Sequence, residues 1–423
     1  MRSRTHRLRL PMSLAVVRHM WRRQRWVLDG LTPGKAANLM LAASQYALRQ
    51  PVMRAWPVVA KVDISPLCNL RCTVCVHAVP SAGSSPQLAE QRFSAAQKMP
   101  VERYREIVRE LSGRTAVVSL YYLGDPLMHP HLDEICDATR EAGINAHVST
   151  NFSFTLSDER LRSMLRSGMT HLTVCVDGIT QEVYARTRVG GRIDLVMDNL
   201  RRLLQLRREM GHRMPRVEVQ YIKFQHNLTQ VEEARRLCAE LGVDQFTEFW
   251  GSLHNYSDFA VDRVQVHQAR TPGALPLCPW PHFSLLVRYD GGVIPCCHHR
   301  VSAQYAPGAE QRVLGNVFDE GVWAVWNSPA YQALRRMVAD PRRSRDEPAL
   351  AASFCHGCRN LFDTDAPSRY RRAEAHAWED LYEMGPKGRV VRKPEPALVQ
   401  LGGAGVVPDT RALAGVDGGP GNV

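Results

Sequence analysis

The sequence lacks any long apolar run. No stretch of its 423 residues approaches the ~18 apolar residues that a membrane-spanning helix needs. The apolar segment nearest the N-terminus, residues 12–17, is short and is soon followed by Arg18, Arg22 and Arg23. We therefore expect neither a spanning helix nor a secretory signal, and we predict a cytoplasmic protein.

Acidic residues are scarce at the N-terminus. Residues 1–57 contain eleven Lys or Arg and a single acid, Asp29, and so carry +10 of the net charge of +12. The rest of the chain is nearly neutral, which argues against a nucleic-acid-binding surface on it.

The same N-terminal segment, residues 1–57, is predicted to be a basic helical extension. One side of a helical pattern in it is apolar: Leu14, Val17, Trp21 and Leu28. A basic helix of this kind can lie on an anionic membrane surface or can cover the main domain. From the sequence we expect covering rather than membrane contact.

Short apolar runs alternate with helical patterns across residues 58–255. Strands are predicted at 59–64, 117–122, 146–150, 171–176, 217–222 and 246–249, and helices at 101–111, 132–142, 158–167, 195–208 and 228–241. This alternation favours a parallel sheet with right-handed crossovers. We predict an α/β fold, a partial (β/α)6 TIM-like barrel, with its reactive groups at the C-terminal ends of the strands.

The remaining segments differ in composition. Residues 265–365 are irregular and rich in Cys, Pro, Trp and Gly, with one helical pattern at 330–338. They predict a small C-terminal domain that depends on a bound metal group for its stability. Residues 385–423 are rich in Gly, Pro and Val without aromatics, and this tail is predicted to be disordered.

Eight of the eleven cysteines fall into three groups. Cys68, Cys72 and Cys75 directly follow the first predicted strand, with the spacing CxxxCxxC. Iron–sulfur clusters generally take four cysteine ligands. Three ligands leave one iron open, and an open position indicates a catalytic metal site rather than a structural one. A zinc site and chance clustering are the alternatives.

The segment Cys68-Asn-Leu-Arg-Cys72-Thr-Val-Cys75 resembles the cluster-binding signature of the radical S-adenosylmethionine (SAM) superfamily. Further segments resemble the family's later motifs in the expected order: Gly124-Asp125-Pro126, Ser149-Thr150-Asn151, and residues 174–178 with Tyr184, Arg188, Gly190 and Gly191. Asp125 stands where the family usually has glutamate.

The resemblance implies a 4Fe–4S cluster on the three cysteines, with SAM bound at its open iron. The implied SAM-binding residues are Gly124, Asp125, Pro126, Ser149, Asn151 and Asp177. It also implies reductive cleavage of SAM to a 5′-deoxyadenosyl radical, which abstracts hydrogen from a substrate. A one-electron reductant such as flavodoxin or ferredoxin would be a partner.

A second set of cysteines resembles the auxiliary-cluster region of the SPASM and twitch subgroup: Cys278, Cys296, Cys355 and Cys358. The resemblance implies one auxiliary 4Fe–4S cluster that accepts an electron from the substrate radical. Cys297 could replace Cys296 as a ligand, and a structural zinc site with the same thiolates is the alternative.

The resemblance favours an oxidoreductase acting on a small hydroxylated metabolite, of sugar or aminocyclitol type. The alternatives are a maturase or epimerase that modifies a peptide or protein, and a non-catalytic scaffold that binds zinc or a cluster. Strand alternation places Cys175 on the same face as Thr173 and Asp177, toward the barrel interior. Our hypothesis is that Cys175 donates a hydrogen atom to a substrate radical; the alternative is a small buried residue.

Overall fold

A computed structural model describes residues 29–73, 75–77, 93–250, 278–296, 313–356, 382–384 and 390–392. The chain divides into two compact units, residues 1–374 and 375–423. Among the described residues, none of the helices has both the length and the apolar character needed to cross a membrane.

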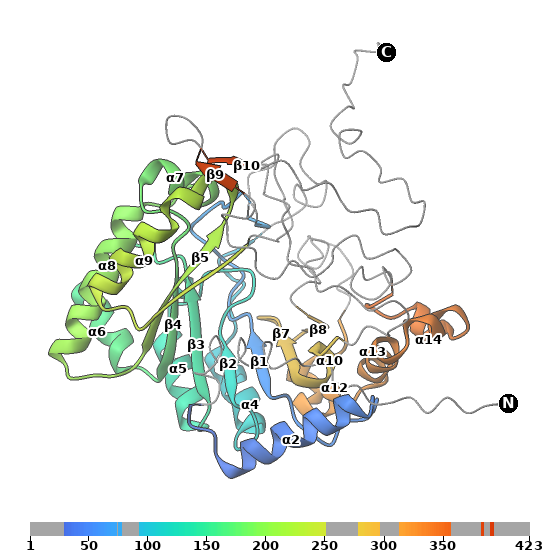
Figure 1. Cartoon of the computed structure of the whole chain (residues 1–423). Coiled ribbons are helices and arrows are strands. Elements are labelled where there is room, and N and C mark those ends of the chain that lie inside the picture. The colour runs from blue at the N-terminus through green and yellow to red at the C-terminus, as the bar shows by residue number, and fades with distance from the viewer. Residues whose placement is uncertain are drawn as a thin grey trace, which may run out of the picture. The chain divides into compact units, whose positions relative to one another are not determined.

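The first unit is built on an eight-stranded sheet (Figure 1) with the strand order β6-β5-β4-β3-β2-β1-β7-β8. Its first six strands are β1 (Val59–Val62), β2 (Val117–Ser119), β3 (Asn145–Thr150), β4 (Met169–Cys175), β5 (Arg216–Lys223) and β6 (Gln245–Trp250). They are parallel to one another. The predicted α/β fold with a parallel sheet is confirmed.

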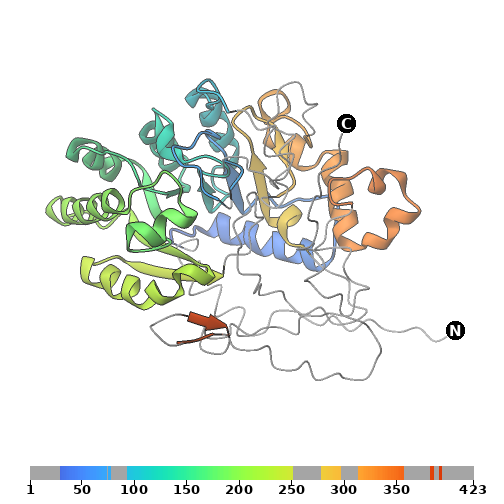
Figure 2. The same ribbon diagram turned by 90° about the horizontal axis from the view of Figure 1, so that it is seen from above.

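Helices alternate with these strands and pack along one side of the sheet (Figures 1 and 2). They are α4 (Val101–Leu111), α5 (Leu132–Glu141), α6 (Asp158–Arg166), α7 (Gln181–Thr187), α8 (Ile193–Glu209) and α9 (Val231–Leu241). In α4 the buried residues recur at three- and four-residue intervals, as Tyr104, Ile107, Val108 and Leu111. This spacing gives a helix one apolar face, which packs on the sheet.

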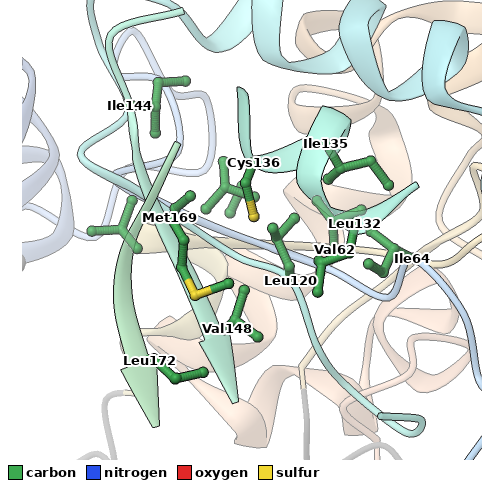
Figure 3. Close-up of a cluster of buried hydrophobic side chains, with 14 of the residues drawn as sticks. Val62, Ile64, Leu120, Leu132, Ile135, Cys136, Ile144, Val148, Met169 and Leu172 are labelled. Atoms are coloured by element: carbon green, nitrogen blue, oxygen red, sulfur yellow. The ribbon is translucent and has the colours of Figure 1, made fainter. Parts of the chain in front are cut away.

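The strands meet α5 in a dense apolar cluster (Figure 3). Val62, Leu120 and Val148 from the sheet side lie in this cluster with Ile135 and Cys136 of α5, and all five are buried. Fully burying an aliphatic side chain contributes ~1.5–3 kcal/mol. This layer therefore fixes the positions of the strand ends that carry the candidate site.

The face of the sheet turned away from this cluster is polar. Leu172 and Val174 belong to the apolar cluster, so strand alternation turns Thr173 to the other face. There a hydrogen-bonded chain crosses four segments: Ser119 to His147 (3.1 Å), His147 to Thr173 (2.9 Å) and Thr173 to Glu218 (3.3 Å).

Two strands are absent from the sequence prediction: β7 (Ser284–Val287) and β8 (Val293–Ile294). Strand β7 pairs in parallel with β1, and β8 pairs antiparallel with β7. The segment predicted as an irregular C-terminal domain therefore extends the barrel sheet. Strands this short have no periodicity of their own in the sequence, and the partner of β7 in the sheet core, β1, lies more than two hundred residues away.

Short helices follow: α10 (Trp280–Phe283), α11 (Val317–Glu320), α12 (Val322–Trp326), α13 (Pro329–Ala339) and α14 (Pro348–Ala351). The predicted helical pattern at 330–338 corresponds to α13. Arg335 of α13 is buried and donates to the carbonyls of Pro51 (3.0 Å) and Trp326 (2.7 Å). These bonds join the C-terminal helices to the chain before β1.

The N-terminal part contains α2 (Pro33–Ala47), capped by the Thr32 side chain, which accepts from the backbone N–H of Lys35. The predicted apolar side of the arm, Leu14 to Leu28, lies outside the described residues.

In the second unit, β9 (Tyr382–Met384) pairs antiparallel with β10 (Val390–Arg392). Strand β10 lies within residues 385–423, the segment predicted to be a disordered tail. Two adjacent valines favour an extended backbone, and pairing with β9 satisfies its polar groups. The other residues of the predicted tail lie outside the described part.

Candidate active site

Cys68, Cys72 and Cys75 lie in the loop that follows β1. Burial raises the pKa of Cys68, and the thiols of Cys72 and Cys75 are close enough to raise it further. The loop is held by backbone hydrogen bonds from Arg71 to Val189 (2.9 Å) and from Thr73 to Thr187 (3.0 Å). The sequence-predicted trio is therefore together, beside the segment that follows α7.

Gly124 packs directly on the chain that leads into Cys68. A Cβ atom at this position would stand 2.1 Å from the carbonyl oxygen of Ser65 and 2.4 Å from that of Leu67. The next backbone N–H, that of Asp125, donates to Leu67 at 2.7 Å. Only glycine allows this approach, so the Gly124-Asp125-Pro126 segment forms one wall of the cysteine loop.

The carboxylate of Asp125 is buried and accepts hydrogen bonds on both oxygens. The donors are the Thr150 hydroxyl (2.9 Å to each oxygen), the Asn151 backbone (2.7 Å), the Asn151 side chain (2.7 Å) and the Leu127 backbone (3.0 Å). Burial raises the pKa of Asp125 to about 6, and these hydrogen bonds oppose the rise. This aspartate therefore anchors the end of β3.

Asn151 links Asp125 to the first cysteine of the loop. Its side-chain amide donates to Asn69 at 2.8 Å and lies 3.8 Å from the Cys68 sulfur. The backbone N–H of Leu70 also points at the Cys68 sulfur, at 3.4 Å. N–H groups directed at a sulfur stabilise negative charge on it, which is the environment that a cluster ligand needs.

Arg188 is the largely buried cation of the site, with 14% of its side chain exposed. Its Nε donates to Asp177 at 2.7 Å, and the other oxygen of Asp177 accepts from the backbone N–H of Ile222 at 2.9 Å. Burial raises the pKa of Cys72 to about 12, while the charge of Arg188 and its hydrogen bond to the thiol oppose the rise. Asp177 therefore positions Arg188 against the second cysteine.

The sequence places Arg188 in a motif but did not predict a role for it. The available signal was that Arg188 stands between Tyr184 and Gly191, both of which the motif includes. A Cβ atom on Gly191 would lie 2.8 Å from the Tyr184 ring and 3.2 Å from Leu70 of the cysteine loop. The motif residues thus pack together around the arginine.

Cys175 lies at the end of β4 and faces the polar side of the sheet, as strand alternation predicts. Its sulfur is 3.6 Å from the Ser149 hydroxyl and 3.9 Å from the Gln220 side-chain oxygen. Burial raises the pKa of Cys175, and the charge of Arg188 opposes the rise. Ser149 and Cys175 therefore lie within electrostatic reach of the cation at Cys72.

These residues fit an iron–sulfur cluster with a bound cosubstrate. In the described segments, no three His, Cys, Asp or Glu side chains converge as the ligands of a single metal ion would. Thiolates of a 4Fe–4S cluster bind different irons, so they stand farther apart than that. The buried hydroxyl of Tyr184, which has no hydrogen-bond partner among the described residues, is a polar group left for a ligand.

The second set of cysteines gathers at α13. Cys278 and Cys355 pack against an apolar cluster formed by Ala333, Met337, Val338 and Leu350. Burial raises the pKa of Tyr331 in the same helix, and Cys296 and Cys355 add to the rise. Three of the four predicted auxiliary ligands are thus close to one helix. Cys358 and the alternative ligand Cys297 lie outside the described residues.

Two family models match the chain. Residues 62–238 match the radical SAM superfamily, and residues 278–359 match the SPASM iron–sulfur cluster-binding domain. The first range contains the cysteine trio and the motifs packed around it. The second contains all four predicted auxiliary ligands.

Individual proteins of known name or structure are also similar to the chain. The tungsten-containing aldehyde ferredoxin oxidoreductase cofactor-modifying protein of Pyrococcus furiosus is 21% identical over 312 residues, which are 65% of this chain and 82% of that protein. The crystal structure of SuiB from Streptococcus suis aligns with a TM-score of 0.51 and 14% identity, over 71% of this chain and 72% of that one. SuiB bound to S-adenosylmethionine gives a TM-score of 0.52 at 14% identity, over 75% and 77%. At this identity the structures support a shared fold.

The family match confirms the predicted cofactors, namely SAM, a 4Fe–4S cluster and auxiliary iron–sulfur binding in the C-terminal region. It also removes the alternative of a non-catalytic zinc scaffold. The chain therefore has a radical SAM domain in residues 62–238 and a SPASM-type iron–sulfur cluster-binding domain in residues 278–359, and it is an enzyme.

Proposed function

We propose that this enzyme removes hydrogen from a small hydroxylated metabolite, of sugar or aminocyclitol type. When bound, SAM and the cluster on Cys68, Cys72 and Cys75 supply a 5′-deoxyadenosyl radical after one-electron reduction by a protein such as flavodoxin or ferredoxin. The observation that carries the proposal is the buried Arg188 between Asp177 and Cys72, beside a polar sheet face.

Arg188 would hold the carboxylate of SAM. A guanidinium offers five N–H donors in a planar fork, and Asp177 uses the Nε group of this one. The charge stays on Arg188 because Asp177 and Cys72 raise its pKa well above the usual value, against the effect of burial. A buried cation next to the second cysteine would attract an anionic group that binds the open iron, such as the carboxylate of SAM.

Asp125 would act on SAM through the backbone. Both of its oxygens already accept hydrogen bonds from Thr150, Asn151 and Leu127. The carboxylate therefore holds its own segment in place, and the backbone of Gly124 to Pro126 is left to receive the amino group. Ser149 and Asn151, at the end of β3, would contact the nucleoside part.

The polar sheet face supports a hydroxylated substrate. Ser119, His147 and Thr173 lie on it in one hydrogen-bonded chain, and Lys223 pairs with Glu248 (3.3 Å) where β5 and β6 end. Oxidation of a carbinol carbon removes a hydrogen atom, a proton and an electron. The auxiliary cluster, which we assign to Cys278, Cys296, Cys355 and Cys358, would take the electron.

A second candidate is modification of a protein or of a protein-bound cofactor. The Pyrococcus furiosus relative is named for modifying the cofactor of another enzyme, and peptide maturation or epimerisation belongs to the same class. In that case Cys175 would return a hydrogen atom to the substrate radical, so the oxidation state of the substrate would not change. One electron from the reductant and one proton would then restore the Cys175 thiol.

Anaerobic reconstitution tests the proposal. We expect about eight irons per chain, from two cysteine-bound clusters, and 5′-deoxyadenosine from SAM under dithionite. Cys72→Ala should abolish both the open cluster and SAM cleavage, while Cys238→Ala, a buried cysteine of α9 outside the site, should retain them. One SAM consumed for each carbonyl formed on a panel of sugars and aminocyclitols supports dehydrogenation. Solvent deuterium at a carbon of the product, without net oxidation, would instead identify the second candidate.

A further inference from the structure

Helix α2 buries three polar side chains and exposes several apolar ones. Its buried residues are Lys35, Asn38, Ala42 and Gln45. The positions exposed along its outer side are Ala37, Met40, Leu41, Ser44 and Ala47, continued by Leu48. Met40 is 70% exposed and Leu48 is 65% exposed. A surface helix normally has the opposite arrangement.

The inward polar residues fix the helix in this orientation. Asn38 exchanges two hydrogen bonds with the backbone of Trp56, at 2.8 and 3.0 Å. The Gln45 side chain accepts from the backbone N–H groups of Arg54 (3.0 Å) and Ala55 (2.9 Å). Lys35 donates to the carbonyl of Gly143. Rotating α2 to hide its apolar side would break all of these bonds, so the outward face is a fixed feature.

The apolar surface continues past the helix. Val52 is 52% exposed, and together with Leu41, Leu48 and Pro51 it lines a groove of about 490 Å³. Of the seven large apolar side chains that are exposed in the described chain, four lie here: Met40, Leu41, Leu48 and Val52. Such a concentration marks an interaction surface.

This surface is at the end of the sheet remote from the cysteine loop. Helix α2 contacts the segments that lead into the strands: Trp56 before β1 and Gly143 before β3. Figure 1 shows it running across that end of the sheet. The cysteine loop instead follows the C-terminal end of β1, so an occupant of the α2 face leaves the active site open.

We propose that the outer face of α2 binds the surface of an anionic lipid bilayer. Residues 1–28 contain eight arginines and no acid, and Arg49 and Arg54 are exposed beside the groove. The one acid of residues 1–57, Asp29, is paired with Arg216 at 3.2 Å. Apolar side chains flanked by cations match the acyl boundary and the anionic headgroups of such a bilayer.

Other occupants fit this face less well. A helix of this length is ~22 Å long and ~10 Å wide, so its outer face offers far less than the ~800 Å² per partner of a stable dimer. An anionic lipid surface supplies both the apolar contact and the negative charge.

Vesicle co-sedimentation of the full-length reconstituted enzyme tests the proposal. We expect binding to phosphatidylcholine vesicles that contain roughly a third phosphatidylglycerol, and roughly tenfold weaker binding to pure phosphatidylcholine. Met40→Glu/Leu48→Glu should weaken binding to the anionic vesicles roughly tenfold. The matched control, Gln205→Glu/Ala239→Glu, adds the same charge at exposed positions of α8 and α9 and should bind as the wild type does.

A second double variant separates the apolar contact from the charge. Met40→Ser/Leu48→Ser leaves the net charge unchanged and should still weaken binding severalfold. Wild-type binding by this variant would overturn the proposal, because the arginines alone would then account for the interaction. So would a failure of the full-length enzyme to bind, binding only after removal of residues 1–28, or a dimer in sedimentation velocity that Met40→Glu/Leu48→Glu dissociates.

Discussion

The Nε of Arg188 donates a hydrogen bond to Asp177 at 2.7 Å, and the Asp177 side chain is only 2% exposed. Asp177 also accepts from the backbone of Ile222 at 2.9 Å, so the ion pair is tied to β5. On its other side the guanidinium contacts Cys72. The pair thus links the sheet to the cysteine loop through charge, at the position where we propose that SAM binds.

Replacing Arg188 should affect both stability and SAM binding. Arg188→Ala leaves the buried carboxylate of Asp177 without its cation, and we expect the free energy of unfolding to fall by ~3–5 kcal/mol. Urea denaturation measures this loss, and equilibrium dialysis with the reconstituted enzyme measures SAM affinity. Arg186→Ala is the control, because Arg186 is half exposed in a surface pair with Glu182. It should cost less than ~1 kcal/mol.

Asp125 should matter for cluster retention as well as for folding. Asp125→Ala leaves the Thr150 hydroxyl and the N–H groups of Asn151 without their acceptor, so we expect a loss of at least ~3 kcal/mol. Because Asn151 reaches Asn69 beside the first cysteine, iron content after reconstitution should fall too. Asp137→Ala, which removes a surface pair with Arg140, serves as the control. Full iron content in Asp125→Ala would contradict the anchoring role.

Gly124 should tolerate no side chain. In Gly124→Ala the Cβ atom would stand 2.1 Å from the Ser65 oxygen, so the chain leading into Cys68 has to move. We expect iron bound at the three-cysteine site to be lost, as followed by the visible absorbance of the reconstituted protein. Gly143→Ala is the control, since Gly143 has a positive φ of 69° but no atom near its Cβ position. That variant should lose only ~1–2 kcal/mol and keep its clusters.

Much of the barrel could be predicted because its pattern is local. Helix α4 occupies residues 101–111 as predicted, since its buried positions recur at helical spacing. Strand β7 could not be predicted, because its four residues form a strand only by pairing with β1. The orientation of α2 could not be predicted either. Periodicity shows that two faces differ, and hydrogen bonds from Asn38 and Gln45 decide which one is buried.

The same distinction holds at the candidate site. The cysteine trio and the motif residues Asp125, Asn151 and Asp177 follow from spacing and resemblance. The contact of Arg188 with Cys72 joins segments more than a hundred residues apart, and neither segment alone indicates it. From the sequence, Asp125 is known only as a replacement for the family's usual glutamate. In the structure this shorter side chain accepts hydrogen bonds from Thr150 and Asn151.

Two cysteines should respond differently to replacement by serine. Cys136 lies in the apolar cluster of Figure 3, with the Ser167 side chain as a hydrogen-bond partner. Cys136→Ser should cost ~1–3 kcal/mol, because it buries a hydroxyl among aliphatic side chains. Cys175→Ser should cost less, since Ser149 and Gln220 lie within reach. The functional test is Cys175→Ala. If Cys175 returns a hydrogen atom, this variant loses turnover or diverts the product, while its cleavage of SAM persists. Unchanged product formation would leave Cys175 a packing residue.

The contribution of His282 to the stability of the protein should decrease as the pH falls from about 6.5 to 4. Burial lowers the pKa of His282 to about 4, and the charge of Arg335 lowers it further. In the unfolded chain the same imidazole has its ordinary pKa of ~6.5. Between these values the unfolded state binds a proton that the folded state excludes, so acid lowers the free energy of unfolding, by up to ~3 kcal/mol for this residue. His282→Gln removes the titrating group. The slope of unfolding free energy against pH should therefore decrease in this range by the amount that corresponds to nearly one bound proton. A slope equal to that of the wild type would show that His282 is charged in the folded protein.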